Sequence, residues 1–189
     1  MFEFDFIQEL LTTLENGGLI LFPTDTVWAI GCDATNPEAV AKVLALKQRE
    51  KGKGLILLAS DSNMVGEYVS HIPPRIDTLL MYHTRPLSII YDDAENLPDA
   101  VLGKKNSVAF RIVQDDFCKK LIEKINKPLV ATTANVDSAE IPMNFGSISS
   151  EIVEGVDYIV RYRREDKKDS ELSVIAYMGE DGELAFLRE

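Results

Sequence analysis

The fold is decided by the stretch Gly18-Leu19-Ile20-Leu21-Phe22-Pro23-Thr24-Asp25-Thr26-Val27-Trp28-Ala29-Ile30-Gly31. Pro23 has no N–H for a sheet ladder and disfavours helical backbone at the preceding residue, so the apolar strand should end there. The three polar residues that follow then stand at a strand end, where open α/β sheets bind ligands. Their two hydroxyls and one carboxylate suit an ammonium group or a hydrated metal phosphate, although a capped turn between two core strands explains them as well.

The length and composition predict one domain spanning residues 1–189. The chain has 189 residues, of which 46% are hydrophobic, and a chain of this size buries roughly 70% of its unfolded surface. The formal net charge of −11 argues against a general nucleic-acid-coating protein, because phosphate contacts require clustered Lys and Arg. Any contact with RNA should therefore be local.

One concentrated basic segment, residues 42–54, stands out on this acidic chain. It carries Lys42, Lys47, Arg49, Lys51 and Lys53 against the single acidic residue Glu50. A positive island suits a small polyphosphate better than a long duplex, although a solvated surface explains it equally well. Lys47 near a helix C-terminus is also favoured by the helix dipole.

Helices and strands are mixed along the chain. We expect strands at 19–22, 27–32, 55–59, 86–91, 107–113, 128–132, 157–162, 173–178 and 183–187, the last two paired as a hairpin. The expected helices are one capped by Asp5 through residue 14, one capped by Asn36, a short one capped by Asp61, one at 75–82, one capped by Asp115 or Asp116 and running towards 125, and a short one before 157. The fold class is thus α/β (α+β), a single domain with a twisted, mixed-direction sheet flanked by helices.

Cysteine usage and the N-terminus predict a cytoplasmic protein. Cys32 and Cys118 have neither CxxC nor metal-ligand spacing, which is typical of reduced thiols in packed interiors. The first residues lack the basic start of a signal peptide, and no apolar run reaches transmembrane length, so we expect no membrane partner. The chain also lacks a P-loop, a Gly-x-Ser-x-Gly elbow and a paired-histidine metal motif.

Arg111 is the most telling single residue. It interrupts the otherwise apolar strand 108–113, and arginine is rarely buried without a partner. It either extends from a sheet edge into solvent or meets an anion in a cleft, and we favour the cleft.

Four segments of the chain together resemble the YrdC/YciO family. The family pattern reads roughly Pro-Thr-Asp/Glu-Thr-x-Tyr-Gly-Leu, then Lys-x-Arg with a Lys or His four residues after the Arg, then x-Val-Ala-x-Arg, then Ser-Ala-Asn. The matching segments here are 23–30, Lys47/Arg49/Lys53, 108–111 and 133–135, in that order over most of the chain. Thr133 replaces the usual serine and keeps the hydroxyl.

The resemblance implies a threonylcarbamoyl-AMP synthase, which forms threonylcarbamoyl-AMP and pyrophosphate from L-threonine, bicarbonate and ATP for tRNA modification. It assigns threonine binding to Thr24, Thr26, Lys53, Arg111 and Ser173, and ATP binding to Lys47, Arg49, Ser107, Thr133, Asn135 and Arg188. Mg²⁺ is expected on the ATP phosphates, and no side chain is assigned as a nucleophile. Further expected partners are tRNA or double-stranded RNA and a downstream threonylcarbamoyl-transferase complex.

The chain departs from the family pattern at several loops. Trp28-Ala29 replaces Tyr-Gly, residues 83–88 replace Trp-Pro-Gly-Pro-Leu-Thr, residues 136–138 replace Leu-Ser-Gly, and Val174 replaces a threonine. Two alternatives follow. A non-catalytic paralogue would bind RNA through the same basic-lined cavity, with salt-dependent affinity that depends on Lys47 and Lys51. The other alternative is an enzyme that adenylates a different small acid.

Overall fold

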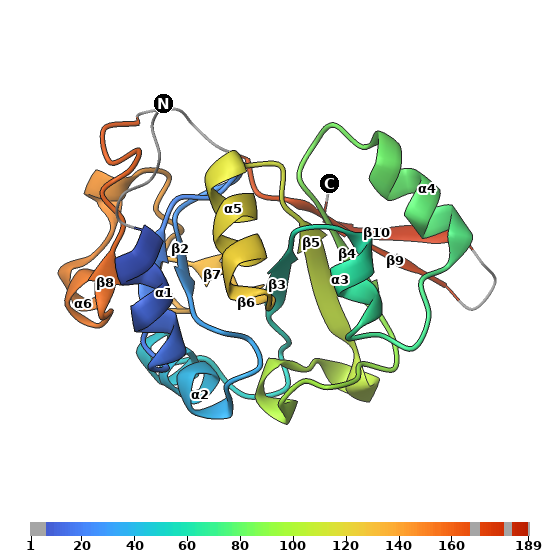
Figure 1. The fold of residues 1–189 in the computed structure, drawn as a ribbon, viewed down its shortest axis with the longest axis horizontal. Coiled ribbons are helices and arrows are strands. Elements are labelled where there is room, and N and C mark those ends of the chain that lie inside the picture. Colours follow the sequence, from blue (N-terminus) through green and yellow to red (C-terminus); the bar gives the residue numbers. More distant parts are fainter. Residues whose placement is uncertain (1–6, 167–170, 180–182, 189) are drawn as a thin grey trace.

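The computed structural model describes residues 7–166, 171–179 and 183–188, and Figure 1 shows how their helices and strands are arranged. The α-helices are α1 (Ile7–Glu15), α2 (Pro37–Leu46), α3 (Ser62–Gly66), α4 (Pro74–Tyr82), α5 (Asp116–Ile125) and α6 (Ser150–Glu154). The strands are β1 (Ile20–Phe22), β2 (Ala29–Gly31), β3 (Ile56–Ala59), β4 (Leu87–Tyr91), β5 (Val108–Ile112), β6 (Leu129–Val130), β7 (Thr132–Thr133), β8 (Tyr158–Ile159), β9 (Val174–Met178) and β10 (Leu184–Arg188). Short 3₁₀ turns lie at Asp99–Val101, Lys104–Asn106 and Phe145–Ser147.

The described strands form two mixed sheets that lie side by side along the long axis of the molecule (Figure 1). One has the order β7-β2-β1-β8, and the other has the order β10-β9-β4-β5-β3-β6. In the larger sheet β3 runs parallel to β5 and β4 parallel to β9, whereas β4 and β5 are antiparallel. The expected mixed-direction sheet flanked by helices is therefore confirmed, with its strands divided between two ladders.

Residues 129–133 carry the chain from one sheet to the other. β6 pairs with β3 of the larger sheet, and β7 pairs with β2 of the smaller sheet. Between them the N–H of Ala131 donates to the carbonyl oxygen of Ile56 at 2.9 Å. Because the two strands are separated by only this residue, side chains at the end of each sheet are brought to a common junction.

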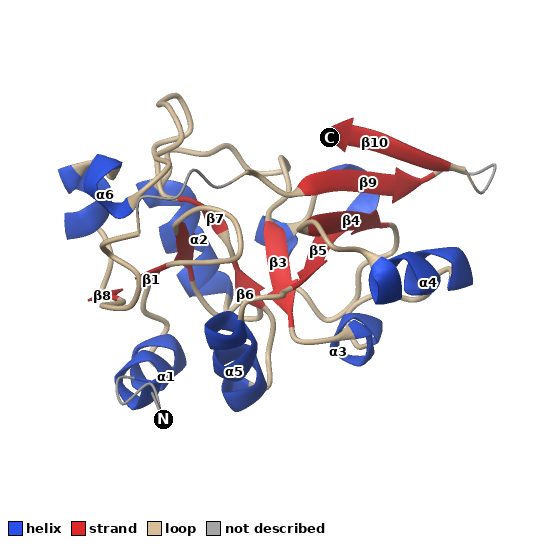
Figure 2. Ribbon diagram, turned by 90° about the horizontal axis from the view of Figure 1, so that it is seen from above, coloured by secondary structure: helices blue, strands red, loops and turns tan. Residues whose placement is uncertain are grey.

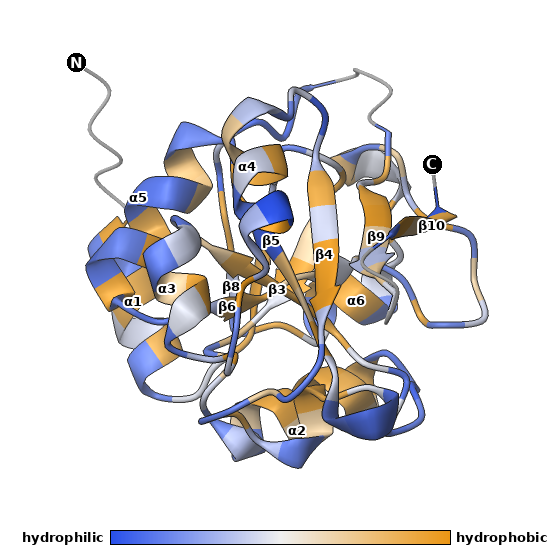
Figure 3. Cartoon of the chain, turned by 90° about the vertical axis from the view of Figure 1, so that its right-hand side faces the viewer, coloured by the Kyte–Doolittle hydropathy of each residue, from blue (hydrophilic) through white to orange (hydrophobic). Residues whose placement is uncertain are grey.

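Helices α1, α5, α3 and α4 lie along one side of the strands, as Figure 2 shows. Each covers the sheets with an apolar face, and the buried side chains form one cluster that includes Phe22 of the smaller sheet and Phe110 of the larger. Figure 3 shows hydrophobic residues along strands β4, β5 and β9, and most residues of β4 and β5 are buried. Burial of this apolar surface is the main favourable contribution to folding.

Local signals fix the ends of several elements. The Asn36 side chain accepts hydrogen bonds from two backbone N–H groups at the start of α2, and the side chains of Asp61 and Asp115 each accept one at the starts of α3 and α5. The strand predicted before Pro23 ends at Phe22, as expected. The strand predicted at 27–32 is shorter, at Ala29–Gly31, since residues 24–28 form the turn. The proposed Asp5 cap and the 180–182 turn lie outside the described residues.

Candidate functional site

A cavity of about 780 Å³ opens at the junction of the two sheets. Nine of the eleven residues proposed from the sequence line it: Thr24, Thr26, Arg49, Lys53, Ser107, Arg111, Thr133, Ser173 and Arg188. Together with Lys104 they include five cationic side chains, and none of the described residues that line the cavity is an aspartate or glutamate. On a chain of net charge −11, this wall concentrates positive potential where an anion would bind.

The turn after β1 presents its hydroxyls to the cavity in a fixed arrangement. Thr24 Oγ1 donates to the carbonyl oxygen of Val27 at 2.9 Å and accepts from the N–H of Thr26 at 3.0 Å. The two threonine hydroxyl oxygens are 2.9 Å apart. Because the only hydroxyl proton of Thr24 is used on Val27, Thr26 is the donor of this pair, which leaves its own lone pairs free to accept a hydrogen bond from a ligand ammonium.

Arg111 is held against this turn. Its Nη2 lies 3.0 Å from Asp25 Oδ1 and 3.4 Å from Thr24 Oγ1, and the Arg111 and Asp25 side chains are 5% and 8% exposed. In the described part of the chain, Nε of Arg111 has no hydrogen-bond partner. The guanidinium thus lies against the 24–26 turn, where Arg111 lines the cavity while its Nε is buried.

Ser173 is positioned by two neighbours at the start of β9. Its Oγ lies 2.9 Å from the hydroxyl oxygen of the buried Ser88, and it accepts from Nη2 of Arg188 at 3.1 Å. Nε of Arg188 donates to the carbonyl oxygen of Ser173 at 2.8 Å. Burial and the nearby positive charge of Arg111 lower the pKa of Arg188. Both arginines line the cavity.

The segment after α2 brings Arg49 and Lys53 to the cavity. Gly52 and Gly54 both have positive φ, +81° and +66°, which glycine adopts without strain. Nη2 of Arg49 donates to the carbonyl oxygen of Gly54 at 3.1 Å, and Nη1 lies 2.7 Å from Asp137 Oδ1. Burial raises the pKa of Asp137, but its hydrogen bond to Arg49 and the surrounding cations outweigh that effect and hold the pKa below its usual range.

Lys47 and Asn135 are the two proposed residues that do not line the cavity. Lys47 is buried, and its ammonium donates to the carbonyl oxygens of Thr133 and Asn135 at 2.7 and 2.6 Å. Thr133 Oγ1 donates to Asn135 Oδ1 at 2.6 Å. Burial lowers the pKa of Lys47 to about 8. Lys47 therefore holds the backbone of residues 133–135 from the protein interior. Of Lys47, Thr133 and Asn135, only Thr133 lines the cavity.

Several residues around the cavity were not proposed from the sequence. Lys104 lines it beside Ser107, Asp137 pairs with its cations, and Ser88 supports Ser173. Of the divergent pair, Ala29 lines the cavity whereas Trp28 packs in the core against Phe145, with ring centroids 4.8 Å apart. A strand-embedded serine and a loop aspartate carry no sequence signal of their own, because their partners lie more than 80 residues away in the chain.

No group of three or more His, Cys, Asp or Glu side chains among the described residues could hold a metal ion. No helix among the same residues has the length and apolar character needed to span a bilayer.

The model of a known protein family, named Sua5_yciO_yrdC and described as "Telomere recombination", matches residues 12–189. The chain belongs to this family. The resemblance proposed from four short motifs is thereby confirmed, and the match includes every residue proposed for the site.

Several relatives of the chain are named threonylcarbamoyl-AMP synthase. The chain is 32% identical to the threonylcarbamoyl-AMP synthase of Pseudoalteromonas translucida over 82% of this chain and 84% of that protein. It is 30% identical to the synthase of Photobacterium profundum over 80% of this chain and 87% of that protein. These relatives are named as synthases, which gives the non-catalytic RNA-binding alternative no support.

Solved structures share the fold. P. abyssi Sua5 complexed with L-threonine has a TM-score of 0.84 and 22% identity, covering 96% of this chain. The chain spans 53% of the length of that protein. E. coli YciO has a TM-score of 0.83 and 19% identity, covering 97% of this chain and 88% of its own. At these identities the likeness establishes the architecture.

Proposed function

We propose that this protein is a threonylcarbamoyl-AMP synthase, which converts L-threonine, bicarbonate and ATP into threonylcarbamoyl-AMP and pyrophosphate. One observation carries the proposal: five cations and several hydroxyls from distant parts of an acidic chain line one cavity that contains no carboxylate among its described lining residues. The curated relatives named as synthases over most of their length support the same reaction.

The residues that line the cavity suit the two organic substrates. Thr26 and Ser173 offer hydroxyls for the amine and hydroxyl of threonine, Thr24 holds Thr26 in place, and the Arg111 guanidinium, which lines the cavity, would attract the carboxylate. Arg49, Ser107, Thr133 and Arg188 would bind ATP. We assign Lys53 to the ATP phosphates as well, instead of to threonine as the resemblance implies, because it shares Asp137 with Arg49. Attack on the α-phosphate gathers negative charge in the transition state, so fixed cations would accelerate it by electrostatic stabilisation and by holding the reactants together.

Lys47 and Asn135 act in this proposal by positioning. Their mutual contacts fix the backbone of residues 133–135, which sets where the Thr133 hydroxyl lies. Mg²⁺ would arrive on the ATP phosphates, since the described lining residues offer hydroxyls but no carboxylate to hold a hard cation by themselves. The product would pass to a transferase complex acting on tRNA, and such a reaction belongs in the cytoplasm.

Pyrophosphate release tests the proposal. We expect release from ATP to require both L-threonine and bicarbonate, and release that is indifferent to threonine would refute it. Thr26→Val keeps the shape of the side chain and removes the hydroxyl, so the KM for threonine should rise about tenfold for one lost hydrogen bond. Thr78→Val, on the exposed surface of α4, is the matched control and should leave the KM unchanged.

A further inference from the structure

One carboxylate, that of Asp137, is directed at the basic wall of the cavity formed by Arg49 and Lys53. Its Oδ1 lies 2.7 Å from Arg49 Nη1, and its Oδ2 lies 3.8 Å from Lys53 Nζ. Asp137 itself is not among the residues that line the cavity, whereas both cations are. Each carboxylate oxygen therefore faces a different cation of the wall from the outer side.

The backbone holds Asp137 in this place. Its N–H donates to the carbonyl oxygen of Lys47 at 2.8 Å, at the end of the helix that leads into the basic segment. The loop that carries Asp137 is also tied down through Asn135, whose side-chain amide donates to the carbonyl oxygen of Ala139 at 2.7 Å. Because the backbone on both sides of Asp137 is tied down in this way, its carboxylate is held beside Arg49 and within reach of Lys53.

The two cations are held unequally. Arg49 makes a short bond to Asp137 and a second bond to a backbone carbonyl, and its side chain is 24% exposed. Lys53 is farther from Asp137 and is 49% exposed, with a second contact of 3.3 Å to the exposed Glu50. The Lys53 side chain can rotate away from Asp137 to contact an incoming phosphate chain. Arg49 would contact the phosphates while it keeps its ion pair with Asp137.

We propose that Asp137 is an internal counterion of the phosphate-binding wall, which weakens the binding of oligophosphates in proportion to their negative charge. The carboxylate neutralises part of the charge of Arg49 and Lys53 and repels a phosphate chain placed a few ångströms away. The wall thereby discriminates among ligands by the number of phosphates they carry. This inference rests on the proposed function only in that the cavity receives the phosphates of a nucleotide.

Calorimetric titration of the full chain with adenosine, AMP and ATP tests the inference. Asp137→Asn removes the charge and keeps an amide oxygen that can accept from Arg49. We expect this variant to bind ATP about three- to tenfold more tightly than the wild type, AMP less than threefold more tightly, and adenosine equally. Glu50→Gln is the matched control, because it removes one negative charge beside the same lysine on the exposed side, and it should change ATP affinity less than twofold.

The outcomes separate the inference from the proposed function. Wild-type binding of ATP with unchanged or weaker binding by Asp137→Asn would overturn the counterion role and leave the synthase proposal standing. Equal tightening in Glu50→Gln would also overturn it, because the effect would then reflect overall charge. Failure of the wild type and both variants to bind any of the three probes would overturn both the inference and the nucleotide site.

Discussion

Replacing Arg111 by methionine tests how strongly the buried ion pair stabilises the wall of the cavity. Methionine keeps most of the unbranched side-chain length and removes the guanidinium. Arg111 Nη2 and Asp25 Oδ1 are 3.0 Å apart with side chains only 5% and 8% exposed, so the variant leaves a carboxylate buried without its counterion. Loss of one partner of a buried pair costs about 3–5 kcal/mol, a large share of a typical stability of about 5–15 kcal/mol.

The chain contains a matched control for this change. Arg85 pairs with Glu171 at 3.2 Å, nearly the same distance, but these side chains are 60% and 81% exposed. An exposed pair contributes about 0–1 kcal/mol, so Arg85→Met should change the free energy of unfolding by less than about 1 kcal/mol. The two variants therefore differ mainly in the burial of the pair.

Urea unfolding measures both variants. The buried Trp28, the only tryptophan of the chain, lies two residues from Thr26 and provides a fluorescence signal. The double variant Asp25→Asn/Arg111→Met should recover part of the lost stability, because the remaining polar group is uncharged. An Arg111→Met effect as small as that of Arg85→Met, or a double variant less stable than Arg111→Met alone, would refute the reasoning.

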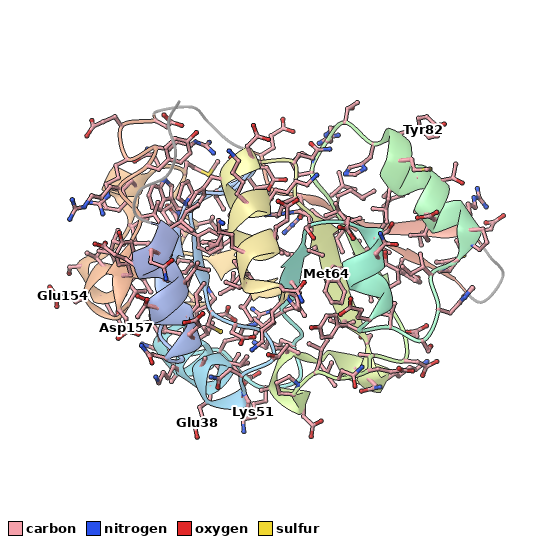
Figure 4. The ribbon with its side chains drawn as sticks, viewed as in Figure 1. Glu38, Lys51, Met64, Tyr82, Glu154 and Asp157 are labelled. Carbon is pink, nitrogen blue, oxygen red and sulfur yellow. The ribbon has the colours of Figure 1, made fainter. Side chains whose placement is uncertain are left out.

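Two further predictions concern the support of the site. Burial lowers the pKa of Lys47 to about 8 from 10.5, so the folded state binds fewer protons than the unfolded state between these values. Unfolding in that window takes up protons, so the wild type should gain stability over Lys47→Met by about 1 kcal/mol per pH unit from pH 8 to 10, measured by urea unfolding at each pH. Lys51, which Figure 4 labels at the outer edge of the molecule, is the exposed control. If the stability difference between the wild type and Lys51→Met rose equally over this pH range, the explanation by burial of Lys47 would be wrong. A methyl group on Gly31 would lie 2.5 Å from the ring of Phe22 and 2.6 Å from a backbone oxygen, so Gly31→Ala should lower the free energy of unfolding by about 2 kcal/mol or more. Gly66→Ala meets nothing closer than 4.0 Å and should be neutral or slightly stabilising, so similar losses in both variants would count against the packing argument.

Local chemistry made much of the fold predictable from the sequence. Pro23 ended a strand for the reason given, Asn36 and Asp115 capped helices, and the apolar run at β3 formed a buried strand. The division of the strands between two sheets was not predictable, because it depends on which partner each two-residue strand finds across the chain. Arg111 could be recognised because a charge in an apolar strand needs a partner.

Other features of the site depend on orientation, which the sequence does not encode directly. Spacing placed Lys47 with Arg49, but Lys47 turns inward to the carbonyl oxygens of residues 133–135 and Arg49 turns towards the cavity. Asp137 lies 88 residues from Arg49 in the chain, so their pairing requires the tertiary structure. The gathering of most of these residues around one cavity was thus predictable from residue types, whereas the division between lining and supporting residues was not.

The residues that line the cavity range from the turn after β1 to β10, the last described strand. Both sheets must therefore be formed before these residues can contact a ligand together. Partly folded chains would consequently lack affinity, and a bound nucleotide or amino acid would act as a reporter of completed folding. A saturating ligand at 100 times its dissociation constant would then add roughly 2.7 kcal/mol to the native state alone. Substrate binding and completed folding are in that sense coupled by the architecture of the two sheets.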